Sequence, residues 1–240
     1  MRRITILALG VLSLFSCSNP INEIEMQLVE GGNFLMGSDA KEAEDDEKPV
    51  HVVGVDSFYL CKYEVSQRLW KYVMGLNPSY FQNPEFPVEC VSYDDVHIFL
   101  NRLNTITGKK YRLPTEIEWE YAAKGGCMQN EYVYSGDDDP FVVAWFLENS
   151  NEQPHSVGRL KGNALGLYDM TGNVHEWCED YYDGTNYARD TINMETHISY
   201  VFRGGSFYSD RQHCRITNRN HAPFDTRNFS LGFRLAHDVE

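Results

Sequence analysis

The chain has 240 residues, of which 13% are aromatic and 42% hydrophobic, and its formal net charge is −14. An acid excess of this size excludes the basic footprint of a nucleic-acid-binding domain, and most of the carboxylates are expected only to keep the protein soluble. The length is enough for one sizeable core, and no internal repeat or low-complexity tract divides it. We therefore expect one domain.

The first residues resemble a secretion signal. Arg2 and Arg3 supply a positive start, and residues 4–15 form an apolar run that is too short to span a bilayer. The run ends in LFSC, residues 14–17, which is similar to a bacterial lipobox, whose cysteine is acylated and becomes the first mature residue. We expect Cys17 to be lipidated; ordinary cleavage with an incidental cysteine is the alternative.

These features set the expected boundaries. A lipoprotein signal peptide covers residues 1–16, a tether covers 17–25 and the folded domain covers 26–238. Several acyl chains on one cysteine bind a membrane firmly, because each buried methylene contributes about 0.8 kcal/mol. The expected location is the bacterial cell envelope, at the outer membrane.

The predicted elements are short. Ser92 with Asp95, and Thr115 with Glu118, have the spacing of helix N-terminal caps, and the apolar runs elsewhere are divided by Gly, Asn, Asp and Pro. In chain order we expect an acidic solvated loop at 42–47, strands at 51–55 and 58–61, helices at 66–74, 92–104 and 115–123, and strands at 201–203 and 232–236. This pattern predicts a loop-rich α+β fold.

Five cysteines remain besides the one in the lipobox: Cys61, Cys90, Cys127, Cys178 and Cys214. An oxidising compartment permits disulfides, but an odd number leaves at least one thiol unless it pairs with another chain. The spacing does not decide the connectivity. Cys61, Cys90 and Cys178 are interpreted as small buried hydrophobic residues.

The segment RGGSFYSDRQHCR at 203–215 is the most informative stretch of the chain. Six further segments accompany it in order: GGNFLMG at 31–37, YLCKYEVS at 59–66, PVECVS at 87–92, RLPTEIEWEY at 112–121, GNVHEW at 172–177 and LGFR at 231–234. Together they resemble the sulfatase-modifying-factor family, which includes formylglycine-generating enzymes. The resemblance implies a C-type-lectin-like fold with little regular secondary structure.

The resemblance also implies a structural calcium ion. The matching positions are Asp169 and Glu176 for side-chain ligands, and Gly172 and Val174 for backbone carbonyls. Calcium takes six to eight oxygen ligands, and two carboxylates would neutralise it. The alternative is that Asp169 caps a turn and Glu176 is solvated or bonded to backbone amides. A second calcium site of some relatives does not carry over, because residues 144–145 differ from its Asn-Ile pair.

In the oxidases of the family, two thiolates spaced C-x4-C bind copper(I), and a substrate cysteine in a C-x-P-x-R peptide becomes formylglycine. Here the first thiolate position is Ser209 and only Cys214 remains. A serine hydroxyl stays protonated at neutral pH and is a poor ligand for a soft ion, so copper is not expected. Ser206 matches a serine of the active-site loop, whereas His175 stands where the oxidases have tryptophan.

His175 and Cys214, with His213 or His221, would provide imidazole and thiolate ligands for a different metal. A lone surface histidine is the commoner outcome. If the segment is extended, His213 and Cys214 point in opposite directions, which argues against the group.

Polar residues near the C-terminus suggest either an anion or glycan cleft or a structural role, in which arginines pair with carboxylates and bind loop carbonyls. The structural role is the favoured interpretation. The residues are Arg211, Arg215, Arg219, Asn220, Arg227 and Asn228.

The expected function is that of a lipid-anchored envelope protein, without copper oxidase activity, that binds a protein or glycan partner. Cys214, Ser206 and Ser209 would line its cleft. The alternative is an oxygen-dependent oxidoreductase of the formylglycine-generating type, which acts on cysteine in C-x-P-x-R peptides. Fold similarity does not decide between them.

Overall fold

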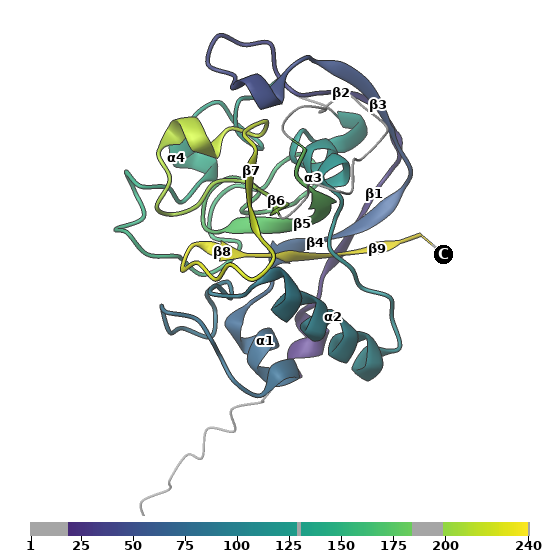
Figure 1. Cartoon of the computed structure of the whole chain (residues 1–240), viewed down its shortest axis with the longest axis vertical. Helices are drawn as coiled ribbons and strands as arrows, with labels where there is room; N and C mark the ends of the chain where they lie inside the picture. The colour runs from purple at the N-terminus through teal and green to yellow at the C-terminus, as the bar shows by residue number, and fades with distance from the viewer. Residues whose placement is uncertain (1–18, 129–130, 184–198, 240) are drawn as a thin grey trace, which may run out of the picture.

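A computed structural model describes residues 19–128, 131–183 and 199–239 (Figure 1). Cys17 and the signal segment therefore lie outside the described residues. Within them, no helix is long and apolar enough to cross a membrane.

Three sheets organise the fold. The central sheet has the antiparallel order β1-β4-β9, the second is a β2-β3 hairpin, and the third has the order β7-β6-β5-β8 with β5 and β8 parallel. The strands are β1 Met26–Val29, β2 Gly32–Met36, β3 His51–Val55, β4 Phe58–Glu64, β5 His175–Tyr181, β6 Ser199–Arg203, β7 Asn220–Pro223, β8 Leu231–Gly232 and β9 Arg234–Asp238. The two ends of the described chain thus meet on β4.

The three predicted helices form, and the second and third begin at their predicted caps. They are α1 Gln67–Met74, α2 Tyr93–Thr107 and α3 Glu116–Ala123. Ser92 accepts a hydrogen bond from the Asp95 amide at 3.2 Å, and Thr115 accepts one from the Glu118 amide at 3.2 Å. In both caps the carboxylate bonds back to the amide of the capping residue, which satisfies two helix donors at once.

Several short helices were not predicted from the sequence: α4 Pro140–Val143, η1 Pro20–Glu23, η2 Asp45–Glu47, η3 Gly126–Met128 and η4 Arg211–Cys214. Pro20–Glu23 lies inside the expected tether, yet Pro20 is buried and Ile21 packs against the core beside α1. The folded part therefore begins before residue 26.

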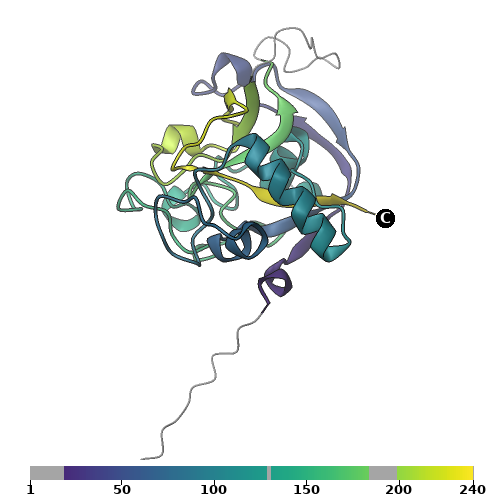
Figure 2. The same ribbon diagram turned by 60° about the horizontal axis from the view of Figure 1, so that its bottom comes forward.

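The central sheet separates two cores. Helices α1 and α2 cover one side, where Trp70 stacks on Phe99 at 5.0 Å, and α3 with β5 and β6 lies on the other side around Trp119 (Figure 1). Figure 2 shows α2, in teal, lying across the yellow strand β9. Phe233 and Leu235 from the end of the chain belong to the core under α2.

Buried ion pairs join distant segments. Arg203 donates to Glu116 at 2.6 Å and to Glu120 at 2.5 Å, and Arg219 makes two hydrogen bonds to Glu116. The exposed Arg227 pairs with Asp95 at 2.7 Å. These C-terminal arginines are bound to carboxylates of the same chain, as the structural interpretation predicted.

The prediction of a solvated acidic loop at 42–47 is wrong at Glu47, and Ala43 is buried as well. Glu47 is fully buried, and both of its carboxylate oxygens accept hydrogen bonds from Arg215, at 2.6 and 2.7 Å. Burial alone would raise the pKa of Glu47, but the bonds from Arg215 and Thr217 lower it below its usual value. The partner lies far along the chain, so no local pattern could indicate it.

Candidate functional site

The site is centred on the turn after β6, where two of the segments noted in the sequence meet. The Gly172 amide donates to the Gly204 carbonyl at 2.8 Å, and the Phe207 amide donates to the Asn173 carbonyl at 2.7 Å. Gly205 has a φ of +72°, and a Cβ there would lie 2.6 Å from the Cys214 sulfur. Glycine is therefore required for this turn to close over Cys214.

Ser209 belongs to a hydroxyl network in this turn. Its Oγ accepts from the Ser206 amide at 3.1 Å and lies 3.0 Å from the Ser206 Oγ. It also lies 3.3 Å from Nε2 of His175, on β5. The structure therefore brings Ser206, Ser209 and His175 together as hydrogen-bonding partners.

Cys214 lies behind this network and is closed to solvent. Its side chain is 0% exposed and belongs to an apolar cluster with Tyr134, Val143 and Phe146. Burial raises the pKa of the Cys214 thiol to about 12. A protonated thiol in an apolar cluster is a small hydrophobic group and not a soft metal ligand. Position 209 supplies a hydroxyl, so Ser209 and Cys214 do not fit a two-thiolate copper(I) centre.

His175 is held as a neutral imidazole. Burial, together with the nearby charge of His213, lowers the pKa of His175 to about 3. The ring meets Phe202 edge to face at 4.8 Å, and its shielded Nδ1 has no hydrogen-bond partner among the described residues. The neutral ring can donate from one nitrogen and accept at the other.

The alternative metal group does not assemble in the structure. His213 lies in the 3-10 turn η4 rather than in an extended segment, where it binds Asp210 at 2.8 Å, and His221 stacks on Tyr182. Within the ranges that the structure describes, no cluster of three or more His, Cys, Asp or Glu side chains could hold a metal ion.

All five cysteines beyond the lipobox are free thiols. Cys61 and Cys178 are buried, as predicted, whereas Cys90 is only partly buried. Cys127 is exposed, and its sulfur lies 3.1 Å from the Tyr121 hydroxyl.

The expected calcium ligands lie near one another, but they already have partners. Glu176 accepts from Arg234 at 2.5 and 2.6 Å and from the Trp119 indole at 2.7 Å, and Asp169 accepts from the Gly158 amide at 2.6 Å. Glu176 is buried and is bonded to side chains, not to backbone amides. In this arrangement the guanidinium of Arg234 neutralises Glu176, so its carboxylate as placed does not fit a calcium ligand.

A third carboxylate, Glu64, makes this region acid-rich. Glu64 accepts from Asn173 at 2.6 Å and from the Val174 amide at 3.1 Å. Burial, with the charges of Asp169 and Glu176, raises the pKa of Glu64. Burial also raises the pKa of Asp169 to about 6. One guanidinium thus faces three carboxyl groups, and the pKa values of Glu64 and Asp169 are both raised.

A surface of aromatic rings flanks Ser209, and sequence reasoning missed it. The aromatic surface consists of Tyr80, Phe81, Tyr208 and Phe229, which are joined with the buried Phe207 beneath them by ring contacts with centroids 5.0 to 6.3 Å apart. Tyr80 is 73% exposed, Tyr208 52% and Phe229 38%. The rings come from three separate loops without regular spacing, so no periodic pattern signals them.

Comparisons with known proteins place this geometry in a family. The model of the sulfatase-modifying factor enzyme 1-like domain matches residues 15–239. The chaperone protein LppX of Paenibacillus barcinonensis is 34% identical, over 75% of this chain and 80% of its own length. The formylglycine-generating enzyme of Streptomyces coelicolor is 30% identical, over 71% of this chain and 59% of its own length.

Among solved structures, PvdO from Pseudomonas aeruginosa superposes with a TM-score of 0.80 at 27% identity, and the match covers 90% of this chain and 95% of that one. The fold is therefore the loop-rich, C-type-lectin-like fold of the formylglycine-generating enzymes, as the sequence predicted. The chain belongs to the sulfatase-modifying factor enzyme 1-like domain family.

Proposed function

We propose that this chain is a lipid-anchored envelope protein that binds a protein partner through the aromatic surface and has no copper oxidase activity. One observation carries the proposal: the Ser209 hydroxyl is bonded to Ser206 and lies against neutral His175, while the Cys214 thiol is buried behind them. This donor set has no exposed thiolate, which the oxidase chemistry requires.

The aromatic surface supports the binding role. Exposed tyrosines in a contiguous patch are typical of interaction sites, because they bury a large area and also offer a hydroxyl. The similarity to a protein named as a chaperone favours a protein partner over a glycan. Lipidation at Cys17 rests on the lipobox alone, and loss of fatty-acid labelling in Cys17→Ser is its test.

Photo-crosslinking in cells tests the partner site. A photoreactive phenylalanine analogue is placed at Tyr208, in the aromatic surface, or at Tyr72, which is 48% exposed on α1. We expect a protease-sensitive adduct of defined mass from position 208 and none from position 72. Equal adducts from both positions, or none from 208, contradict a protein-binding surface. A glycosidase-sensitive adduct would assign the surface to a glycan.

The alternative function is formylglycine-generating oxidation of cysteine peptides. It is favoured by the similarity to a formylglycine-generating enzyme and by the retention of Ser206 and Cys214. It would require the buried Cys214 to become exposed and another soft ligand to replace Ser209.

As a separate part of this function we propose a structural calcium ion near Asp169 and Glu176, which requires the Arg234 guanidinium to leave Glu176, because that carboxylate does not fit a calcium ligand as placed. The excess of carboxyl groups over Arg234 supports it, and the existing ion pair of Glu176 opposes it. A bound ion stabilises the folded state by mass action, so calcium added after chelation should raise the unfolding temperature. Asp169→Asn should abolish that rise. An unchanged unfolding temperature, with no calcium found by elemental analysis, would remove calcium from the proposal.

A further inference from the structure

A cavity lies away from the turn that carries Ser209. Its volume is about 780 Å³, and it opens between the loop 37–50, the segment 131–134 and the residues 211–217. Known small-ligand sites span about 300 to 1,000 Å³, so the cavity is large enough for a ligand. It contains neither Ser209 nor His175.

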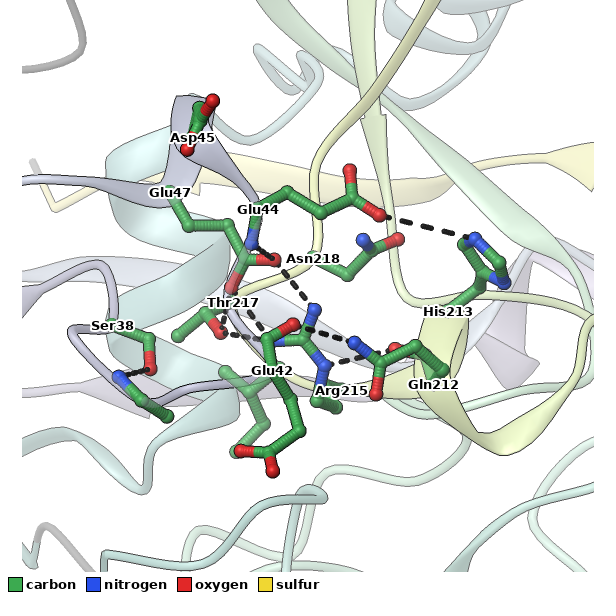
Figure 3. A network of polar contacts seen from close by, with 12 residues as sticks. Ser38, Glu42, Glu44, Asp45, Glu47, Gln212, His213, Arg215, Thr217 and Asn218 are labelled. Atoms are coloured by element: carbon green, nitrogen blue, oxygen red, sulfur yellow. Dashed lines mark hydrogen bonds and ion pairs between the residues drawn. The ribbon is translucent and has the colours of Figure 1, made fainter.

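The walls of this cavity are fixed by polar contacts. Arg215 makes two hydrogen bonds to Glu47, which also accepts from Thr217 at 2.6 Å (Figure 3). Gln212 donates to the backbone carbonyl of Glu42 at 2.6 Å and so ties the loop 37–50 to η4. The cavity is therefore preformed rather than dependent on a flexible loop.

Each basic residue of the lining is paired with a carboxylate, although Lys124 shares Glu120 with Arg203. Lys124 binds Glu120 at 2.8 Å and Arg215 binds Glu47. Arg211 likewise binds Glu148, with its Nε 2.9 Å from the carboxylate. All three carboxylate partners lie outside the lining.

The acidic residues of the lining are not neutralised in the same way. In the described part of the chain, no ion pair involves Asp39, Glu42 or Glu131, and all three are exposed. The Glu42 carboxylate points away from the Glu47–Arg215 pair (Figure 3). The cavity therefore presents a net negative charge that comes from two separate segments.

Apolar side chains complete the lining. Leu35 is 55% exposed, Val133 44% and Tyr132 40%, whereas Tyr134 and Ile216 are buried at the wall. A bound ligand can cover large hydrophobic side chains that are exposed at the mouth of a cavity. The complementary ligand is therefore both cationic and apolar.

We propose that this cavity binds a basic peptide segment of a partner protein, in which Arg or Lys alternates with aliphatic residues. In an extended peptide, alternate side chains point to opposite faces, so one face carries the cations and the other the apolar groups. The unpaired carboxylates of the lining lie on two separate segments, so they are best matched by several cations that are spaced apart. A peptide with repeated Arg or Lys residues supplies such cations. The preformed walls reduce the entropic cost of binding.

Fluorescence anisotropy of the full chain in a neutral detergent tests this site. The probe is a labelled Leu-Arg-Leu-Arg-Leu-Lys peptide, and the variant combines Asp39→Asn, Glu42→Gln and Glu131→Gln. The matched control combines Glu30→Gln, Asp56→Asn and Glu152→Gln, three exposed acids outside the cavity. We expect at least a tenfold weaker Kd for the cavity variant and a change below twofold for the control.

Two further arms separate a peptide site from simple charge attraction. A peptide with glycine in place of leucine keeps its charge and should bind at least tenfold more weakly, as should Leu35→Ser combined with Val133→Ser. Spermine should not displace the probe at equal concentration. Equal losses in the cavity and control variants, undiminished binding of the glycine peptide, or displacement by spermine would overturn the proposal.

Discussion

A hydroxyl at position 209 and an imidazole at position 175 give this site its chemistry. The Ser209 Oγ lies 3.3 Å from His175 Nε2, and the low pKa of His175 keeps the ring neutral at physiological pH. The sequence indicated the loss of one thiolate, because that needs only residue identity. It did not indicate that Cys214 is buried, because burial depends on a cluster built from α4 and from the segment around Tyr134.

The partly buried imidazole of His175 predicts a pH dependence of stability. His175 has a pKa of about 3 in the folded state, whereas an unfolded histidine titrates near about 6.5. Between these values the unfolded chain binds more protons, so the contribution of His175 is fully present above about pH 6.5 and is lost as the pH falls toward 3. Urea unfolding of His175→Gln from pH 4 to 7 should show a flatter dependence than the unmodified protein. Parallel curves would contradict a His175 ring that is held neutral in the folded protein.

At the scale of elements, local signals were strong for helix starts and weak for loops. Ser66, Ser92 and Thr115 each cap the helix that the sequence predicted, because a cap is formed by neighbouring residues. The loop 37–50 is held by Glu47 and Arg215, which are 168 residues apart. A run of acidic residues is expected to be solvated unless a distant guanidinium neutralises one of its carboxylates. The sequence around the run does not show which carboxylate that is.

The buried Glu47–Arg215 ion pair is predicted to stabilise the loop 37–50. Glu47→Gln leaves a buried guanidinium without its counter-charge and should lower the free energy of unfolding by about 3 to 5 kcal/mol. Asp45→Asn, in the same short helix but fully exposed, should change it by less than about 0.5 kcal/mol. Urea denaturation at pH 7 measures the free energy of unfolding of both variants and of the unmodified protein.

A joint Glu47→Met and Arg215→Met variant should recover much of the loss, because it removes both charges. The pKa of Glu47 is lowered, so the contribution of the pair is present above the unfolded pKa and is lost as the pH falls through the folded one. Equal effects of Glu47→Gln and Asp45→Asn would show that the pair does not hold the loop.

For the molecule as a whole, the order of the seven segments that resemble the family predicted the scaffold, and the structure and the relatives confirm it. The first and last strands of the described part both pair with β4, two cores form on opposite sides of the central sheet, and ion pairs join segments remote in sequence. The aromatic surface and the acidic cavity could not be predicted, because each collects residues from loops that only the complete fold brings together.

The central claim is that this scaffold binds a partner without copper oxidase activity. It is tested most directly by incubating the purified protein with copper(I), oxygen and a C-x-P-x-R peptide, and following the peptide mass. Ser209→Cys runs beside it, with the Streptomyces coelicolor formylglycine-generating enzyme as positive control. We predict an unchanged mass with the unmodified protein, because Ser209 supplies no thiolate and Cys214 is buried. Conversion of the peptide cysteine to formylglycine by the unmodified protein would contradict the claim.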